Sequence, residues 1–129
     1  MRHAILLSLA LTLPTFAAAD GAIAVAMPNI NGFDETQSQE LLTGIVTAIV
    51  VGMNCPGFEI TDGEWSLLNG AADLIANNNL ALDRGAYDTK YFGPAFALLD
   101  QPDTCAVEGP KVLPMVKLLI DLGGSTEPQ

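Results

Sequence analysis

Apolar residues recur every three or four positions in several stretches of the chain, which is the periodicity of helices with a buried face. The clearest stretch is 41–53, where the repeat contains no charged residue. Gly44, Ala48 and Gly52 lie four apart within it and form a stripe of small residues. A helix that is apolar nearly all round is buried on several sides. The pattern therefore predicts a central core helix over about 34–53, with close neighbours along the small stripe.

The same stretch has an alternative interpretation as a membrane segment. A helix that spans a bilayer needs about 20 consecutive apolar residues, whereas a run of about 10–14 is typical of a buried core helix. Asn54 and Pro56 end the apolar run directly after 41–53. We therefore interpret it as the core of a globular domain.

Capping signals and helix breakers set the boundaries of the other elements. Asp34 and Gln37 have the spacing of a capping box, in which each side chain binds the other residue's backbone N–H. Thr61 and Glu64 repeat that spacing. A Gly-Pro pair at Gly93 is expected to interrupt the chain between two helices. After the central helix, the expected helices cover about 62–76, 80–93, 94–100 and 113–122.

Two of these helices carry expectations about burial. In the segment 94–100, Phe96 and Leu99 are expected to face inward. The last helix is expected to bury Val112, Leu113, Val116, Leu119 and Ile120.

No alternation of polar and apolar residues indicates a strand. We predict an all-α fold, a small four- to five-helix orthogonal bundle around the central helix.

The first residues have the pattern of a secretory signal peptide. A short basic start precedes an apolar segment, and small residues at 17–19 suit a cleavage site before Asp20. We expect residues 1–19 to be removed and the protein to be periplasmic or secreted, without a membrane anchor. Residues 20–33 would form either a loose tail or a short segment laid on the core, and their position after the new terminus favours a flexible tail. The helical domain would then cover 34–124, followed by a frayed tail at 125–129.

Two cysteines, Cys55 and Cys105, permit one intramolecular pairing. An even number of cysteines in an exported chain indicates a disulfide. The pair is not a C-x-x-C motif, so a thioredoxin-like redox role has little support. We predict a structural disulfide between them.

Removal of the signal peptide changes the balance of charged residues. Four basic side chains remain against fifteen acidic ones, a side-chain net charge of −11. Such a charge repels the phosphate backbone, so a nucleic-acid partner is excluded. The single histidine, His3, lies in the signal peptide. Nucleophilic triads and zinc sites that require histidine are therefore not expected.

Calcium is the remaining metal to consider for an acidic exported protein. With Gly63 at the sixth position of an EF-hand, Phe58 occupies the first position, and with Gly32 there, Met27 does. Neither side chain supplies an oxygen ligand, so we expect no metal site and no cofactor. The other acidic pairs are interpreted as solvated loop residues: Asp83 with Asp88, and Asp100 with Asp103.

Two further clusters are candidates for function. Glu59, Asp62 and Glu64 have the composition of an acid–base pair, but acids at a helix start are also expected for electrostatic reasons. We therefore expect no catalytic residue among them. The second cluster surrounds Gly93 and suits either a ligand pocket or, at helical spacing, the core. It contains Tyr87, Tyr91, Phe92 and Phe96.

These observations favour a non-enzymatic exported helical protein that acts through protein or ligand contacts. The acidic surface suggests a basic protein partner. Two alternatives are an acid-activated periplasmic chaperone and an inhibitor or immunity protein for a basic enzyme. The chain is similar to the acid-stress chaperones in size, export signal, helicity and wide cysteine spacing. It departs from them in having few lysines and arginines.

Overall fold

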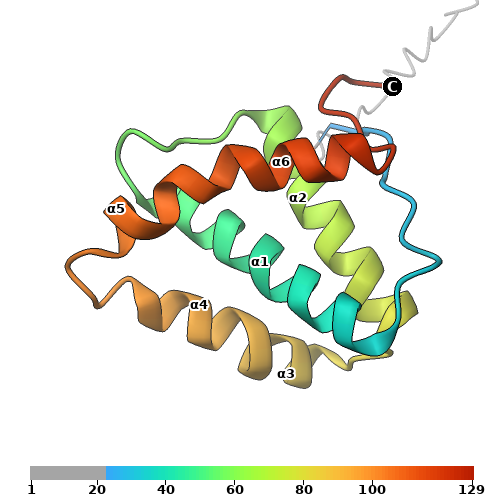
Figure 1. Cartoon of the computed structure of the whole chain (residues 1–129), viewed down its shortest axis with the longest axis horizontal. Coiled ribbons are helices and arrows are strands. Elements are labelled where there is room, and N and C mark those ends of the chain that lie inside the picture. Colours follow the sequence, from blue (N-terminus) through green and yellow to red (C-terminus); the bar gives the residue numbers. More distant parts are fainter. Residues whose placement is uncertain (1–22) are drawn as a thin grey trace, which may run out of the picture.

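The structure, a computed structural model, describes residues 23–129, so the predicted signal peptide lies outside the described residues. Every regular element in the described range is a helix (Figure 1), which confirms the all-α class. The elements are α1 (Glu35–Asn54), α2 (Asp62–Leu74), η1 (Ile75–Asn79), α3 (Arg84–Tyr87), η2 (Asp88–Phe92), α4 (Gly93–Leu98), α5 (Thr104–Glu108), η3 (Gly109–Lys111) and α6 (Val112–Asp121). Of the three η segments, η1 and η2 are π-helical and η3 is a 3₁₀ helix.

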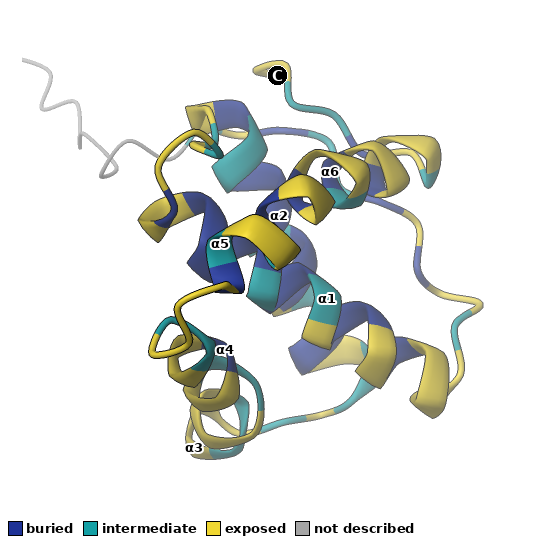
Figure 2. Ribbon diagram, turned by 60° about the vertical axis from the view of Figure 1, so that its left-hand side comes forward, coloured by how far each residue is buried: buried dark blue, intermediate teal, exposed yellow. Residues whose placement is uncertain are grey.

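α1 is the central helix, as its sequence predicts. It contacts α2, α4 and α6, and Figure 1 shows α6 on one side of it and α3–α4 on the other. In Figure 2 the inward face of α1 is buried along most of its length and its first turns are exposed, as are the outward faces of α3, α4 and α6. Leu42, Ile45 and Val46 of α1 are fully buried. None of the helices among residues 23–129 is long and apolar enough to cross a membrane.

The small stripe of α1 lies where neighbours come close. A side-chain carbon added at Gly44 would lie 2.6 Å from the terminal methyl of Met115 on α6. A carbon added at Gly52 would lie 2.7 Å from Ile60. The prediction of close neighbours along this stripe is therefore confirmed.

Both predicted capping boxes form. The Asp34 carboxylate accepts a hydrogen bond from the Gln37 N–H at 2.8 Å, and the Gln37 side chain accepts one from the Asp34 N–H at 3.0 Å. The Thr61 hydroxyl and the Glu64 carboxylate make the same exchange at the start of α2. Each box satisfies backbone N–H groups that have no partner within the helix.

The predicted disulfide also forms. Cys55, at the C-terminal end of α1, is bonded to Cys105 in α5, with their Cα atoms 5.4 Å apart. Cys105 lies in the short helix that leads into η3 and α6. The bond therefore attaches the end of the central helix to the last third of the chain.

The segment 23–33 is laid on the core and does not form a loose tail. Ile30 is 1 % exposed and Val25 is buried beside it in the core. The backbone N–H of Asn29 donates to the carbonyl of Leu122 at 2.9 Å. Apolar burial and this long-range bond hold the segment despite its position near a chain end.

The C-terminal tail is tied to the same segment. Ser125 donates its N–H to the Ala26 carbonyl, and Gln129 donates to the Ala24 carbonyl at 2.8 Å. The tail is therefore not frayed along its length. α6 ends one turn earlier in a Schellman motif, with Gly123 at φ 108° and the Gly124 N–H bonded to Leu119.

The expected interruption at Gly93 is absent, because α3, η2 and α4 follow one another without a break. Gly93 has helical dihedrals, and its N–H bonds to the Asp88 carbonyl five residues earlier. This wider π turn lies directly before Pro94, which has no N–H to donate and whose ring would clash in a regular α-helix. The π turn thus accommodates the proline, and residues 84–98 form a single helical unit.

Candidate functional site

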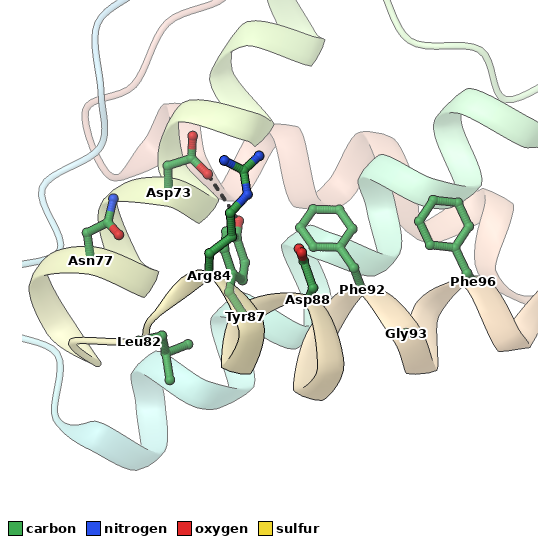
Figure 3. Close-up of a pocket in the computed structure, with 9 residues that line it drawn as sticks. All are labelled: Asp73, Asn77, Leu82, Arg84, Tyr87, Asp88, Phe92, Gly93 and Phe96. Atoms are coloured by element: carbon green, nitrogen blue, oxygen red, sulfur yellow. Dashed lines mark hydrogen bonds between the residues drawn. The ribbon is translucent and has the colours of Figure 1, made fainter.

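An open groove of about 750 Å³ lies between α2–η1 and the α3–η2–α4 unit (Figure 3). Its volume falls within the range of small-molecule and side-chain binding pockets. It is lined by Asp73, Asn77, Leu82, Arg84, Tyr87, Asp88, Phe92, Gly93 and Phe96.

One wall is a stripe of side chains four residues apart: Arg84, Asp88, Phe92 and Phe96. Residues at this spacing lie on one helix face. The stripe is charged in its first half and aromatic in its second half. The groove therefore has a polar end and an aromatic end along the same helical unit (Figure 3).

The opposite wall completes the polar end of the groove. Asp73 and Asn77, again four residues apart, project from α2 and η1. The hydroxyl of Tyr87 donates a hydrogen bond to Oδ1 of Asp73 at 3.3 Å, which joins the two walls. Partial burial, followed by the neighbouring Asp73 charge, raises the pKa of Tyr87 above that of a free phenol.

The aromatic end contains a side chain that the fold does not bury. Phe96 is 52 % exposed, so the prediction that it faces inward is wrong, whereas Leu99 packs against the core. The Phe92 ring lies 5.2 Å from Tyr87 and 6.4 Å from Phe96, measured between ring centroids. The three rings therefore form a continuous row of which the last member is open to solvent.

Of the aromatic cluster around Gly93, three members line the groove, and Tyr91 packs against the core without lining it. Asp73, Asn77 and Arg84 were not singled out from the sequence. These polar residues are spaced four positions apart on two helical segments, which is visible in the sequence. That spacing identifies a site only once the two segments are known to face each other.

Three of the other acidic candidates bind backbone N–H groups. Glu64 completes the cap of α2, and Glu59 accepts a hydrogen bond from the Gly57 N–H at 3.0 Å. Hydrogen bonds from the Glu59 and Gly57 backbone lower the pKa of the Glu59 carboxyl. Asp83 is the N-cap of α3, and its carboxylate accepts from the Ala86 N–H at 2.7 Å. These three acids lie outside the groove. Asp88, interpreted from the sequence as a solvated loop residue, instead lies in η2 and lines the groove.

No group of three or more His, Cys, Asp or Glu side chains within residues 23–129 is placed to hold a metal ion. No protein-family model, curated protein sequence or solved structure matches the chain. The groove and the surface around it are the features of the described residues whose chemistry bears on function. Ring faces beside carboxylates at an open surface suit recognition of a cation-bearing partner.

Proposed function

We propose that this protein is an exported, non-enzymatic binding protein that engages a basic protein partner. The observation that carries the proposal is the surplus of carboxylates that the fold does not neutralise. Residues 23–129 contain fourteen acidic and four basic side chains. The ion pairs among them are Lys111 with Glu108 and Lys117 with Asp121, at 3.2 and 3.3 Å.

Most of the remaining carboxylates lie at the surface without a cation beside them. Such a surface costs stability through self-repulsion. It also accelerates association with a positively charged protein and selects against acidic ones. A role as inhibitor or immunity protein for a basic enzyme is one specific form of this function.

The direct test is affinity capture with the oxidised protein from an extract of exported proteins of the producing cells, at about 20 mM and about 0.5 M NaCl, where screening differs strongly. The proposal expects saturable capture of a basic protein at low salt and its loss at high salt. A parallel column carries the variant Asp62→Lys/Asp100→Lys/Asp103→Lys as a control for charge. This column should retain less of the basic protein. If the column captures no basic protein at low salt, the proposal is contradicted.

A second candidate, the acid-activated chaperone, is favoured by a different observation. α6 exposes three large apolar side chains, Leu113 at 62 %, Leu118 at 43 % and Ile120 at 42 %, although Leu113 and Ile120 were expected to be buried. Protonation of the surface acids near about pH 3 would remove most of the negative charge of the protein. Suppression of client aggregation at that pH and not at neutral pH would support this function. Equal behaviour at both values would exclude it.

A further inference from the structure

We infer that the groove is the docking site for an extended segment of the basic partner, one that carries a lysine or arginine close to a large apolar side chain. The inference rests on the proposed function and assigns it to one surface. It follows from the charge at one end of the groove, the exposed ring at the other, and the distance between them.

The polar end has room for a cation. Asp73 and Asp88 supply two carboxylates against the single guanidinium of Arg84, so the lining is net negative. Neither carboxylate takes part in an ion pair among the described residues. An incoming ammonium or guanidinium at Asp88 would gain a charge-assisted hydrogen bond. Arg84, with five N–H donors, is suited to carbonyl oxygens of the segment's main chain.

The aromatic end is suited to an apolar anchor. Phe96 is half exposed, and its ring lies beside that of Phe92 at an interplanar angle of 31°. Aromatic side chains are enriched in the centres of protein interfaces, where a few residues supply most of the binding free energy. Burial of the open face of Phe96 by an apolar side chain of the partner would add hydrophobic stabilisation.

The spacing of the two ends favours an extended peptide. Asp88 and Phe96 are eight residues apart on one helical unit, which is about 12 Å at the α-helical rise of 1.5 Å per residue and somewhat less through the π-helical η2. Four residues of extended chain cover about 13 Å, and residues four apart point to the same side of that chain. The segment that fits therefore carries its cation and its apolar side chain four positions apart.

Synthetic peptides test this directly. The probe is a terminally blocked, fluorescently labelled Lys-Gly-Ser-Gly-Phe, with Glu-Gly-Ser-Gly-Phe and Lys-Gly-Ser-Gly-Ser as controls, titrated by fluorescence anisotropy. We expect the probe to bind at least about tenfold more tightly than either control, which corresponds to about 1.4 kcal/mol. A peptide in which lysine and phenylalanine are adjacent should bind more weakly than the probe by a comparable factor. Failure of the probe to bind, or equal binding of all peptides, overturns the inference.

Variants place the binding in the groove. Phe96→Ala and Asp88→Asn should each weaken probe binding about five- to tenfold, the scale of one interface contact. Leu113→Ala and Asp100→Asn, an exposed leucine and an exposed loop acid outside the groove, are the matched controls and should leave it unchanged. Because Phe96 and Asp88 are exposed, their variants should fold, which circular dichroism verifies.

The outcomes separate this inference from the proposed function. If a basic partner is captured in a salt-sensitive manner but Phe96→Ala and Asp88→Asn capture it equally well, the groove is not the docking site and the proposed function stands. If no basic partner is captured, the proposed function fails. If phenethylammonium, a small organic cation, competes with the probe at equal molar concentration, the groove is a small-cation site and the peptide assignment is wrong.

Discussion

The contact between Tyr87 and Asp73 joins the two walls of the groove, and titration of the Tyr87 phenol reports on it. Because the pKa of Tyr87 is raised in the folded state, the folded protein holds the phenol proton above the pH at which the unfolded chain releases it. The stability that this supplies is present below about pH 10, the ordinary pKa of tyrosine, and is lost as the pH rises further.

We predict that Asp73→Asn shifts the ionisation of Tyr87 to lower pH, because it removes the second cause of the shift and leaves burial, the first, in place. The measurement is the ultraviolet absorbance of tyrosinate in a Tyr91→Phe background, which leaves Tyr87 as the single tyrosine. Asp100→Asn, a loop acid outside the groove, should not move the curve. An unchanged titration in Asp73→Asn would show that the carboxylate does not reach the phenol in solution.

Gly63 is the glycine whose replacement the fold tolerates least. A side-chain carbon there would overlap the backbone carbonyl oxygen of Thr126, which cannot rotate away as a side chain would. We predict that Gly63→Ala costs about 1–2 kcal/mol of the free energy of unfolding, within the usual range for overpacking, despite the better helix propensity of alanine.

Gly32 is the matched control for this substitution. No atom lies within 4 Å of a carbon added at Gly32, so Gly32→Ala should change stability by no more than about 0.5 kcal/mol. Urea denaturation of both variants makes the comparison. Equal stabilities would mean that the C-terminal tail does not pass over the start of α2.

At the scale of elements, the segment 23–33 is an integral part of the core. Ile30 is almost fully buried, so Ile30→Ala should destabilise the protein by about 2–5 kcal/mol. Ile120→Ala makes the same chemical change at a side chain that is 42 % exposed, and it should cost less than about 1 kcal/mol. Similar losses in thermal or urea denaturation would show that the segment is detached in solution.

The disulfide joins two elements that are far apart in the sequence. It closes a loop with a sequence separation of 50 residues. A loop of that length corresponds to about 4 kcal/mol in the chain-entropy description, so the double variant Cys55→Ala/Cys105→Ala should lose about that much. Reduction of the unmodified protein with dithiothreitol is the independent comparison. A loss below about 1 kcal/mol by both routes would show that the bond does not stabilise the fold.

For the molecule as a whole, the sequence predicted what is encoded locally. The caps at Asp34 and Thr61 depend on two side chains three positions apart, and the central helix depends on one continuous repeat. The site depends on tertiary placement. Phe96 was assigned to the core because its spacing fits a buried face, yet no helix of the bundle covers its ring. Likewise, the burial of residues 23–33 depends on bonds to Leu122 and Ser125, which local sequence does not reveal.

The same long-range view applies to charge, which belongs to no single element. The described residues carry fourteen acids and four bases, and like charges spread over a small domain destabilise the compact state. The screening length falls from about 30 Å at 0.01 M salt to about 8 Å at 0.15 M. We predict that the melting temperature at pH 7 rises over this interval of NaCl. The variant Asp100→Lys/Asp103→Lys, at two exposed loop positions away from the groove, should have a higher melting temperature at low salt and a smaller dependence of that temperature on salt.

Because hydrophobic salting-out would act on both proteins alike, a smaller salt dependence in the variant isolates the electrostatic part. An identical dependence in both proteins would mean that the surface carboxylates do not repel one another strongly enough to matter. The carboxylate surplus would then carry no stability cost that binding of a basic partner would relieve.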